Sequence, residues 1–439
     1  MLKNGGEKKY HETYNFISFA ALINFRNSIT NVKRFFGYFL FIFFIAGGSV
    51  LAQSCSQKPQ SSQKPTLVNK DCIDASLPTI EQQKKIAIEI KAEKKAKSID
   101  SVFQHRVKLG FNGSLIIEQN GVVIYKNTTG VCNIKNKECI SPKSTFQLAS
   151  ISKTFTGIAV LQLMEQGKIK LTDTIQKYIP HFPYKNITIE NLLSHRSGLP
   201  NYLYSFEDKH RKNIEIPNNE MIMKWFAEAK PTPRPYGYPN RGFNYNNTNY
   251  IVLARIVEII TRQPFADYMR EHLFLPLKMY STFIDTHAPD SLLQTRTSGY
   301  DGKRLRLRDF YDGVYGDKGV FSTPEDLLRW YHALRSGCVV KKETLENAFT
   351  PRSLERRSRH NYGLGFRLMT NLHNMTNVHY VYHGGWWNGY SNMFWMDYKN
   401  DYVIIMLSNK RNYMSYQLKP LISILEDGNP SEYEEKLNN

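Results

Sequence analysis

The sequence contains few cysteines and no metal-binding cysteine pair. Only five of the 439 residues are cysteine, namely Cys55, Cys72, Cys132, Cys139 and Cys338. An odd number at irregular intervals does not predict a disulfide framework, and the absence of CxxC pairs argues against structural zinc. Cys132 and Cys139 flank a short polar stretch and could face each other across a hairpin, as a disulfide or as free thiols. We predict no metal site and no cofactor.

Acidic residues are also in short supply. The chain has 39 Asp and Glu against 58 Lys and Arg, a formal net charge of +19. Such an excess would suit a nucleic-acid-binding protein, because clustered cations neutralise phosphates. Here the positive charges are scattered singly, and no zinc-finger, basic-zipper or RNA-recognition signature accompanies them. We therefore predict no nucleic-acid partner, and favour a basic exported protein that lies near an anionic envelope.

Charge is absent from one long segment near the N-terminus. Residues 35–52 (FFGYFLFIFFIAGGSVLA) carry no charge and directly follow Lys33 and Arg34. This order is typical of a secretory signal, and the run is just long enough to span a bilayer as a helix. A buried core helix fits poorly, because the run has no amphipathic pattern and a polar linker follows it. Signal cleavage before Gln53, a retained membrane anchor and lipid modification of Cys55 all remain open, and each places the rest of the chain outside the cytoplasm.

The remaining sequence predicts one large domain. Residues 1–52 form an N-terminal extension, 53–78 a polar linker, 79–430 the domain and 431–439 a tail. An amphipathic helix is expected over 79–108, and Asn120-Gly121 predicts a type I′ hairpin within 113–126. Further predicted elements are a helix over 150–166, strands over 378–383, 390–397 and 402–408, and a helix over 416–425. Strands at both ends with helices between them predict an α+β fold, an antiparallel sheet built from both ends of the domain, flanked by helices and carrying a mainly helical insertion.

Ser150 and Lys153 form the first candidate catalytic pair. Positions three residues apart share one face of a helix, so the amine can reach the hydroxyl. A serine hydroxyl becomes a good nucleophile when a neighbouring base takes its proton. The same spacing occurs in the linker, at residues 61–64, where no helix pattern follows. The apolar helix predicted after Ser150 distinguishes the Ser150–Lys153 pair from the linker motif.

Two further motifs contain candidate site residues. Tyr245 and Asn247 directly precede a helical pattern, and a tyrosine can transfer protons while an asparagine positions a substrate amide. His383, Gly384 and Gly385 follow an apolar strand, where glycines permit close approach of a ligand or of another backbone. The next backbone N–H, that of Trp386, is placed to join that of Ser150 in an oxyanion hole. A plain strand-to-loop turn is the alternative for the glycines.

Taken in order, these motifs resemble the serine β-lactamase-related hydrolases, which include class C β-lactamases, penicillin-binding proteins and esterases. The resemblance covers about residues 80–428 and is found in six segments, 146–155, 192–200, 245–247, 319–327, 362–366 and 383–385. It implies a β-lactamase/DD-peptidase-like fold and an exported serine hydrolase that acts through an acyl-enzyme. The implied substrate is a small molecule or a peptidoglycan-type compound, as an ester, an amide or a β-lactam.

The resemblance also implies roles for individual residues. Ser150 resembles the acylated nucleophile, Lys153 the lysine that helps to deprotonate it, and Tyr245 the general base. Asn247 resembles a substrate-amide contact. His383 stands where lactamases carry the lysine of a Lys-Thr-Gly triplet, and histidine is mostly neutral near pH 7. We therefore expect esterase or peptidase activity rather than efficient β-lactam hydrolysis.

Other conspicuous residues receive other interpretations. His195 is expected to be structural, and residues 352–359 are expected to form a solvated basic loop. Trp386 and Trp387 either line the pocket or pack against the protein. The alternative for the whole chain is a non-catalytic envelope protein that keeps the fold in order to bind peptidoglycan or a partner.

Overall fold

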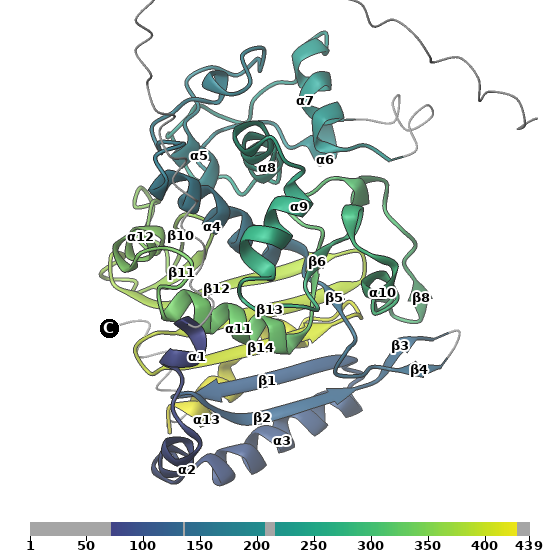
Figure 1. Ribbon diagram of the computed structural model, residues 1–439, viewed down its shortest axis with the longest axis vertical. Helices are drawn as coiled ribbons and strands as arrows, with labels where there is room; N and C mark the ends of the chain where they lie inside the picture. The colour runs from purple at the N-terminus through teal and green to yellow at the C-terminus, as the bar shows by residue number, and fades with distance from the viewer. Residues whose placement is uncertain (1–71, 135–136, 207–215, 428–439) are drawn as a thin grey trace, which may run out of the picture. The chain divides into compact units, whose positions relative to one another are not determined.

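A seven-stranded antiparallel sheet is the scaffold of the protein. The computed structural model describes residues 72–134, 137–206 and 216–427. The strand order is β10-β11-β12-β13-β14-β1-β2 (Figure 1). Their bounds are β1 Gly113–Gln119, β2 Val122–Thr129, β10 His360–Tyr362, β11 Arg367–Thr370, β12 Val378–Trp387, β13 Tyr390–Asp397 and β14 Tyr402–Ser408. Strands from both ends of the domain meet where β1 pairs with β14, which confirms the predicted fold class.

Alternating side chains of the sheet belong to two different cores. On β14, Val403, Ile405 and Leu407 belong to the larger hydrophobic cluster, while Ile404 and Met406 belong to the smaller one. This alternation is the two-residue period of a strand that is covered on both faces. The smaller core lies under α3 (Ala92–Lys108) and α13 (Lys419–Leu425). The larger core includes residues of α11 (Pro324–Arg335) and of the helical region.

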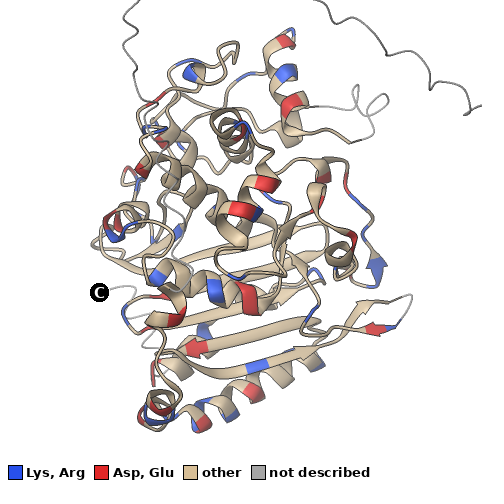
Figure 2. Ribbon diagram, in the orientation of Figure 1, with Lys and Arg blue, Asp and Glu red and all other residues tan. Residues whose placement is uncertain are grey.

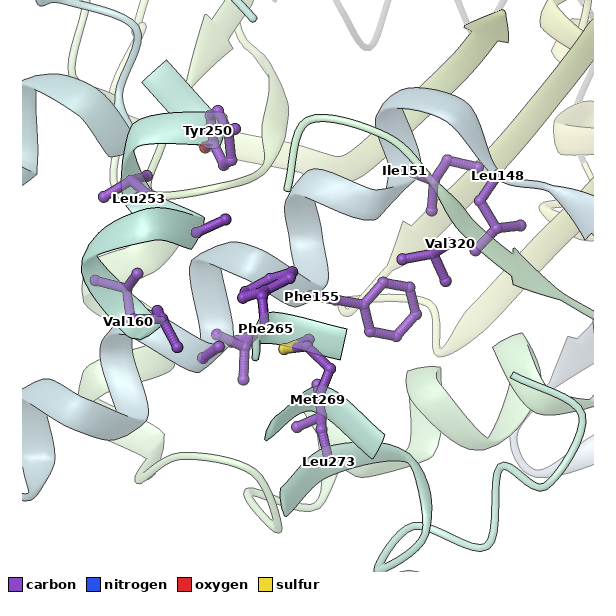
Figure 3. Packing of buried hydrophobic residues seen from close by; sticks show 14 of the residues in the cluster. Leu148, Ile151, Phe155, Val160, Tyr250, Leu253, Phe265, Met269, Leu273 and Val320 are labelled. Atoms are coloured by element: carbon purple, nitrogen blue, oxygen red, sulfur yellow. The ribbon is translucent and has the colours of Figure 1, made fainter. Parts of the chain in front are cut away.

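The predicted helical insertion lies between β2 and β10. Its main helices are α4 Ser152–Glu165, α5 Ile189–Leu193, α7 Asn219–Glu228, α8 Thr248–Thr261 and α9 Phe265–Met269. All of α4 from Ser152 to Leu163 is buried, so this helix is a central core element rather than an amphipathic surface helix. Phe155 stacks on Trp330 at 4.4 Å between ring centroids. Figure 3 shows Phe155 of α4 among side chains of neighbouring segments, including Phe265 and Val320.

The smaller elements connect this region to the sheet. They are α6 Tyr202–Ser205, α10 Asp290–Leu293, α12 Lys342–Ala348, the strands β3 Val131–Asn133, β4 Glu138–Cys139, β5 Phe146–Gln147, β6 Phe283–Ile284, β7 Tyr300–Asp301, β8 Arg304–Leu305 and β9 Val320–Ser322, the 3₁₀ helices η1 Ala149–Ile151, η2 Ile175–Lys177, η4 Asp285–His287, η5 Phe310–Gly313 and η6 Met414–Tyr416, and the π-helical turn η3 Arg270–Phe274. β5, β9 and β6 pair into a three-stranded sheet. The turn η1 therefore comes shortly after a strand, β5, that is held by pairing with β9.

Most of the predicted elements are confirmed, with three differences. The Asn120-Gly121 hairpin is present, and both residues have the positive φ of its turn, 51° and 74°. The helix expected over 79–108 is two helices, α2 Ile80–Glu89 and α3, because Lys91 adopts a left-handed φ of 54°. The last helix begins at Lys419 rather than at 416. β12 continues through both glycines to Trp387, so these glycines lie inside a strand and not after it.

The end of the predicted linker is part of the folded domain. Residues Cys72–Ser76 form helix α1, and Cys72 forms a disulfide with Cys338. The irregular cysteine spacing gave no signal for this bond, because its partners are 266 residues apart. Cys132 and Cys139 are free thiols. The predicted signal or anchor, Cys55 and the tail lie outside the described residues, among which no helix has the length and apolar character needed to cross a membrane.

Charged side chains are interspersed on the described surface. Along α3, for example, Glu93 and Asp100 stand among the Lys and Arg residues (Figure 2). Such mixing is typical of a solvated helix face and not of a phosphate-binding stripe.

Candidate active site

Ser150 lies in the tight turn that connects β5 to α4. The turn η1 comprises Ala149–Ile151, and Ala149 has a left-handed φ of 51°. A non-glycine residue in this conformation is strained, and such strain collects at functional sites. Ser150 is half-buried, whereas both of its neighbours are buried. The fold therefore presents this one hydroxyl at the end of a buried helix.

Lys153 lies directly beside Ser150. Its Nζ is 3.0 Å from Ser150 Oγ, as the three-residue spacing predicts. It donates a second hydrogen bond, of 2.8 Å, to the carbonyl oxygen of Asp317. The side chain of Lys153 is fully buried. With two oxygen partners and no solvent around it, the amine is held in one position against the hydroxyl.

Asp317 is part of a buried polar network that the sequence did not reveal. Its carboxylate accepts a hydrogen bond from the Tyr202 hydroxyl at 3.0 Å, and Lys318 donates to the same hydroxyl at 2.6 Å. Burial lowers the pKa of Lys318, although the nearby Asp317 opposes this shift. These three residues fix the backbone carbonyl that holds Lys153. Gly319, which follows Lys318, is the first residue of the segment 319–327 that resembles the family. Asp317 lies just outside this segment, and no sequence motif predicted its role.

Tyr245 and Asn247 lie just before α8. Lys153 Nζ is 5.0 Å from the centre of the Tyr245 ring. The Tyr245 hydroxyl and the Asn247 side-chain oxygen are buried and have no hydrogen-bond partner among the described residues. Buried polar atoms are nearly always bonded. The unpartnered Tyr245 hydroxyl, on the ring beside Lys153, is therefore a group that a substrate can engage.

Arg367 adds a positive charge to this cluster. Its guanidinium lies over the Tyr245 ring, 4.6 Å from the centroid. Burial disfavours its charge, but attraction to the hydroxyls of Tyr245, Tyr382 and Tyr362 raises its pKa overall. Sequence reasoning missed Arg367, because it looks like one basic residue among many. Its position directly after the segment 362–366 was the only available signal.

His383 is buried and fully hydrogen-bonded. Its Nδ1 donates to the carbonyl oxygen of Gly384 at 2.8 Å, so Nε2 carries no proton and accepts from the Tyr362 hydroxyl at 3.0 Å. Burial and the positive charges of Arg367 and Lys153 hold its pKa well below 6.5. The histidine is therefore neutral at pH 7. A direct contact between His383 and a substrate stays a prediction, and both ring nitrogens already have protein partners.

The two glycines allow β12 to approach the nucleophile turn. A Cβ added to Gly385 would lie 2.1 Å from the carbonyl oxygen of Leu148. A Cβ on Gly384 would meet the Tyr416 ring at 3.0 Å. The space beside Gly385 is thus occupied by another backbone rather than left for a ligand. The oxyanion hole formed by Ser150 and Trp386 stays a prediction.

The two tryptophans after the glycines differ in environment. Trp386 is 54% exposed, and the Arg411 guanidinium lies 5.2 Å from its ring. Trp387 donates from Nε1 to Asp312 at 2.8 Å, and Lys318 lies 4.9 Å from its ring. Trp387 therefore packs against the protein, and Trp386 presents its indole to solvent.

The remaining interpretations have mixed outcomes. His195 is buried, and its Nδ1 accepts from the backbone N–H of Asn246 at 3.1 Å, which fits a structural residue. The basic stretch 352–359 is not merely solvated. Arg352 pairs with Glu190 at 2.9 Å, and Glu355 pairs with the largely buried Arg196 at 2.9 Å. Among the described residues no group of three or more His, Cys, Asp or Glu could hold a metal ion.

Known proteins share this fold and its sequence pattern. The chain is 29% identical over 345 residues to penicillin-binding protein 4* of Bacillus subtilis (strain 168), covering 74% of each chain. A class C β-lactamase structure superimposes with a TM-score of 0.63 at 17% identity, covering 76% of this chain and 98% of the other. The D-amino acid amidase of Ochrobactrum anthropi SV3 superimposes with a TM-score of 0.62 at 20% identity, covering 78% and 99%.

The family itself follows from a match to a family model. The model of the family described as Beta-lactamase matches residues 99–426. This span runs from within α3 to the residue after α13 and contains every candidate site residue. The chain therefore belongs to the β-lactamase family, which has a serine-hydrolase-type fold.

Proposed function

We propose that this protein is a serine hydrolase that forms an acyl-enzyme on Ser150. The observation that supports this most directly is the 3.0 Å contact between Lys153 Nζ and Ser150 Oγ. The unpartnered Tyr245 hydroxyl supplies a second proton-transfer group close to the amine. The chemistry needs no metal or cofactor.

The proposed reaction has two steps. In the first, Tyr245, assisted by Lys153, takes the single proton of the Ser150 hydroxyl while Oγ bonds to the substrate carbonyl carbon. The carbonyl oxygen becomes an oxyanion, and the N–H groups of Ser150 and Trp386 stabilise it. The bond to the leaving group then breaks, and the proton passes to the departing atom. In the second step the oxygen of a water molecule bonds to the acyl carbon, and the bond between that carbon and Ser150 Oγ breaks. One proton of the water returns to Oγ, and the carboxylic acid leaves.

We propose a small-molecule or peptidoglycan-type substrate, with ester or amide hydrolysis favoured over efficient β-lactam hydrolysis. The neutral, hydrogen-bonded His383 supports this preference, because it supplies no permanent charge where lactamases have lysine. We also propose that the protein is exported to the cell envelope. The Cys72–Cys338 disulfide supports export, since such bonds persist in oxidising compartments.

The test is covalent labelling. A fluorophosphonate probe and a fluorescent penicillin are incubated with the wild type and with Ser150→Ala, and mass spectrometry locates the adduct. We expect one adduct, on Ser150, in the wild type and none in the variant, with turnover reduced by at least about 10³-fold. The Ser61→Ala variant, from the matching linker motif, is the control. A protein that binds penicillin without acylation would instead be the non-catalytic envelope protein.

A further inference from the structure

Asp317 contacts two buried lysines through different atoms. Lys153 donates to its carbonyl oxygen at 2.8 Å, whereas Lys318 lies 3.5 Å from its carboxylate. We propose that Lys318 is a positioning residue, which pairs with the Asp317 carboxylate and so leaves the Lys153 amine without a counter-ion. The inference rests on the proposed function and adds to it a residue that controls proton transfer.

The contacts of Lys318 engage both carboxylate oxygens of Asp317. Lys318 Nζ lies 3.5 Å from Oδ1 and donates to the Tyr202 hydroxyl at 2.6 Å. That hydroxyl donates in turn to Oδ2 at 3.0 Å, and burial raises its pKa well above 10, so it keeps its proton. Burial lowers the pKa of Lys318, whereas the negative charges of Asp317 and Asp312 raise it. The Asp317 carboxylate is therefore committed to Lys318 and Tyr202.

Lys153 has no carboxylate partner among the described residues. Its two hydrogen bonds go to Ser150 Oγ, at 3.0 Å, and to the Asp317 carbonyl oxygen. A carbonyl oxygen accepts a hydrogen bond but carries no full negative charge. A buried ammonium without a counter-ion is costly, and an amine avoids this cost by giving up its proton. The pairing of Lys318 thus favours an amine at Lys153 that can take part in proton transfer.

The other ionisable side chains of this cluster include no carboxylate. They are two tyrosines whose ring centres lie 5.0 and 5.7 Å from the Lys153 amine, two buried histidines and one arginine, namely Tyr245, Tyr250, His195, His383 and Arg367. Burial is the main cause that holds the pKa of both histidines well below 6.5, so they are neutral at pH 7. The arginine stays charged and cannot release its proton. Asp317 is therefore the carboxylate that the two lysines share.

Loss of Lys318 would change the partner of this carboxylate. The carboxylate and the carbonyl group of Asp317 belong to one residue, so the freed negative charge stays within a few bonds of the Lys153 contact. In a site closed to solvent this charge stabilises the protonated amine strongly. Proton transfer through Lys153 would then require a higher pH.

The first experiment measures kcat/KM for 4-nitrophenyl acetate between pH 5 and 10. We expect Lys318→Met to move the acidic limb of the profile upward by about one pH unit, so that kcat/KM on that limb falls about 10-fold and recovers at high pH. Lys318→Arg keeps a positive charge beside Asp317 and is the matched control, whose acidic limb should stay at the wild-type position. A Lys318→Met profile that falls by the same factor at every pH would overturn the assignment, because lost packing does not depend on pH.

The second experiment removes both charges and keeps the carbonyl oxygen. The double variant Asp317→Asn/Lys318→Met should return the acidic limb towards the wild-type position, whereas a purely structural role would leave it at least as impaired as Lys318→Met. If Lys318→Met does not fold, Asp317→Asn alone tests the same idea, because loss of the shared negative charge should move the limb to lower pH.

Fluorophosphonate labelling at pH 9 shows whether each variant keeps a reactive Ser150. A labelled double variant whose limb matches that of Lys318→Met, or a labelled Asp317→Asn whose limb does not move, would overturn the role of Lys318 and leave the proposed hydrolase intact. A wild type that takes up no label would instead overturn the proposed function itself.

Discussion

At the scale of single residues, the site combines polar groups that are fixed by hydrogen bonds with polar groups that have no hydrogen-bond partner among the described residues. Lys153 has two oxygen partners, whereas the Tyr245 hydroxyl has none among the described residues. Arg367 lies over the tyrosine ring. A proton that leaves Ser150 therefore has two acceptors within the cluster, and the two can be separated by substitution.

The first prediction concerns proton transfer. Arginine stays protonated and cannot act as a base, so Lys153→Arg should reduce kcat nearly as much as Lys153→Ala. Tyr245→Phe keeps the ring over which Arg367 lies but removes the hydroxyl, and should lower kcat by about 10²–10⁴-fold with a smaller effect on KM. Steady-state kinetics between pH 5 and 10 provide the measurement. An unchanged kcat and pH profile in Tyr245→Phe would leave Lys153 as the sole base.

The second prediction concerns pH and stability. The pKa of buried His383 lies well below 6.5 in the folded protein, whereas an unfolded histidine titrates near 6.5. Below about pH 6.5 the unfolded chain takes up a proton that the folded chain resists, so the unfolding free energy falls with decreasing pH until the folded pKa is reached. The full contribution is present above pH 6.5.

Urea unfolding at pH 7.5, 6.0 and 5.0 measures this effect. His383→Gln should lose less stability over the interval than the wild type, by at most about 1.4 kcal/mol per pH unit. Buried His195, whose pKa is also lowered, remains in both proteins, as do His272 and His360, and these groups contribute to the residual slope. Parallel pH curves for the two proteins would show that His383 is not kept neutral by the fold.

Sequence patterns identified the residues of this cluster whose chemistry is visible in short motifs. Ser150, Lys153 and Tyr245 stand at fixed spacings next to helix patterns and lie together as expected. Arg367 and Asp317 escaped detection because the first resembles many surface arginines and the second contributes a backbone carbonyl. A main-chain acceptor leaves no signature in the residue type.

At the scale of elements, the contact between β12 and η1 sets the geometry of the site. Gly385 leaves room for the Leu148 carbonyl, and the strained Ala149 follows it. The position of Ser150 thus depends on how closely one strand approaches one turn.

Gly385→Ala tests this contact. The new Cβ would lie 2.1 Å from the Leu148 oxygen, so the strand and the turn must separate. We expect a loss of about 1–3 kcal/mol of stability and a fall in kcat of about 100-fold. Gly384→Ala, whose Cβ has its nearest contact with the Tyr416 ring at 3.0 Å, is the neighbouring control and should be milder. Equal effects of the two substitutions would contradict the role assigned to Gly385.

Helices and strands with a clear periodic sequence pattern were predictable, but the points at which they break or continue were not. β13 and β14 match the predicted bounds, as alternation and flanking turns indicated. For β12, the strand before β13, the predicted end was His383, because glycine disfavours strands. In the fold β12 continues to Trp387, since pairing with β13 outweighs that preference. The break at Lys91, where φ is 54°, likewise has no signal in the local sequence pattern.

At the scale of the whole molecule, the disulfide attaches α1 to the residues after α11. Cys338→Ser should lower the unfolding free energy by about 2–4 kcal/mol, because the Cys72–Cys338 bond closes a loop across most of the domain. Thermal unfolding with and without reductant measures this loss. Cys139→Ser removes an exposed free thiol and should change stability by no more than about 0.5 kcal/mol. A wild type that is insensitive to reductant would refute the prediction.

The pairing of β1 with β14 also determines the order in which the molecule can form. Gly113 lies opposite Ser408 in this pairing. The hairpin of β1 and β2 is therefore synthesised early, but the other edge of β1 stays unpaired until β14 has been synthesised. Such distant pairing slows folding. During this interval a nascent chain exposes an apolar strand edge that invites association with other chains. A chaperone that occupies this edge, or secretion of the chain before it folds, would protect the protein until its C-terminal strand arrives.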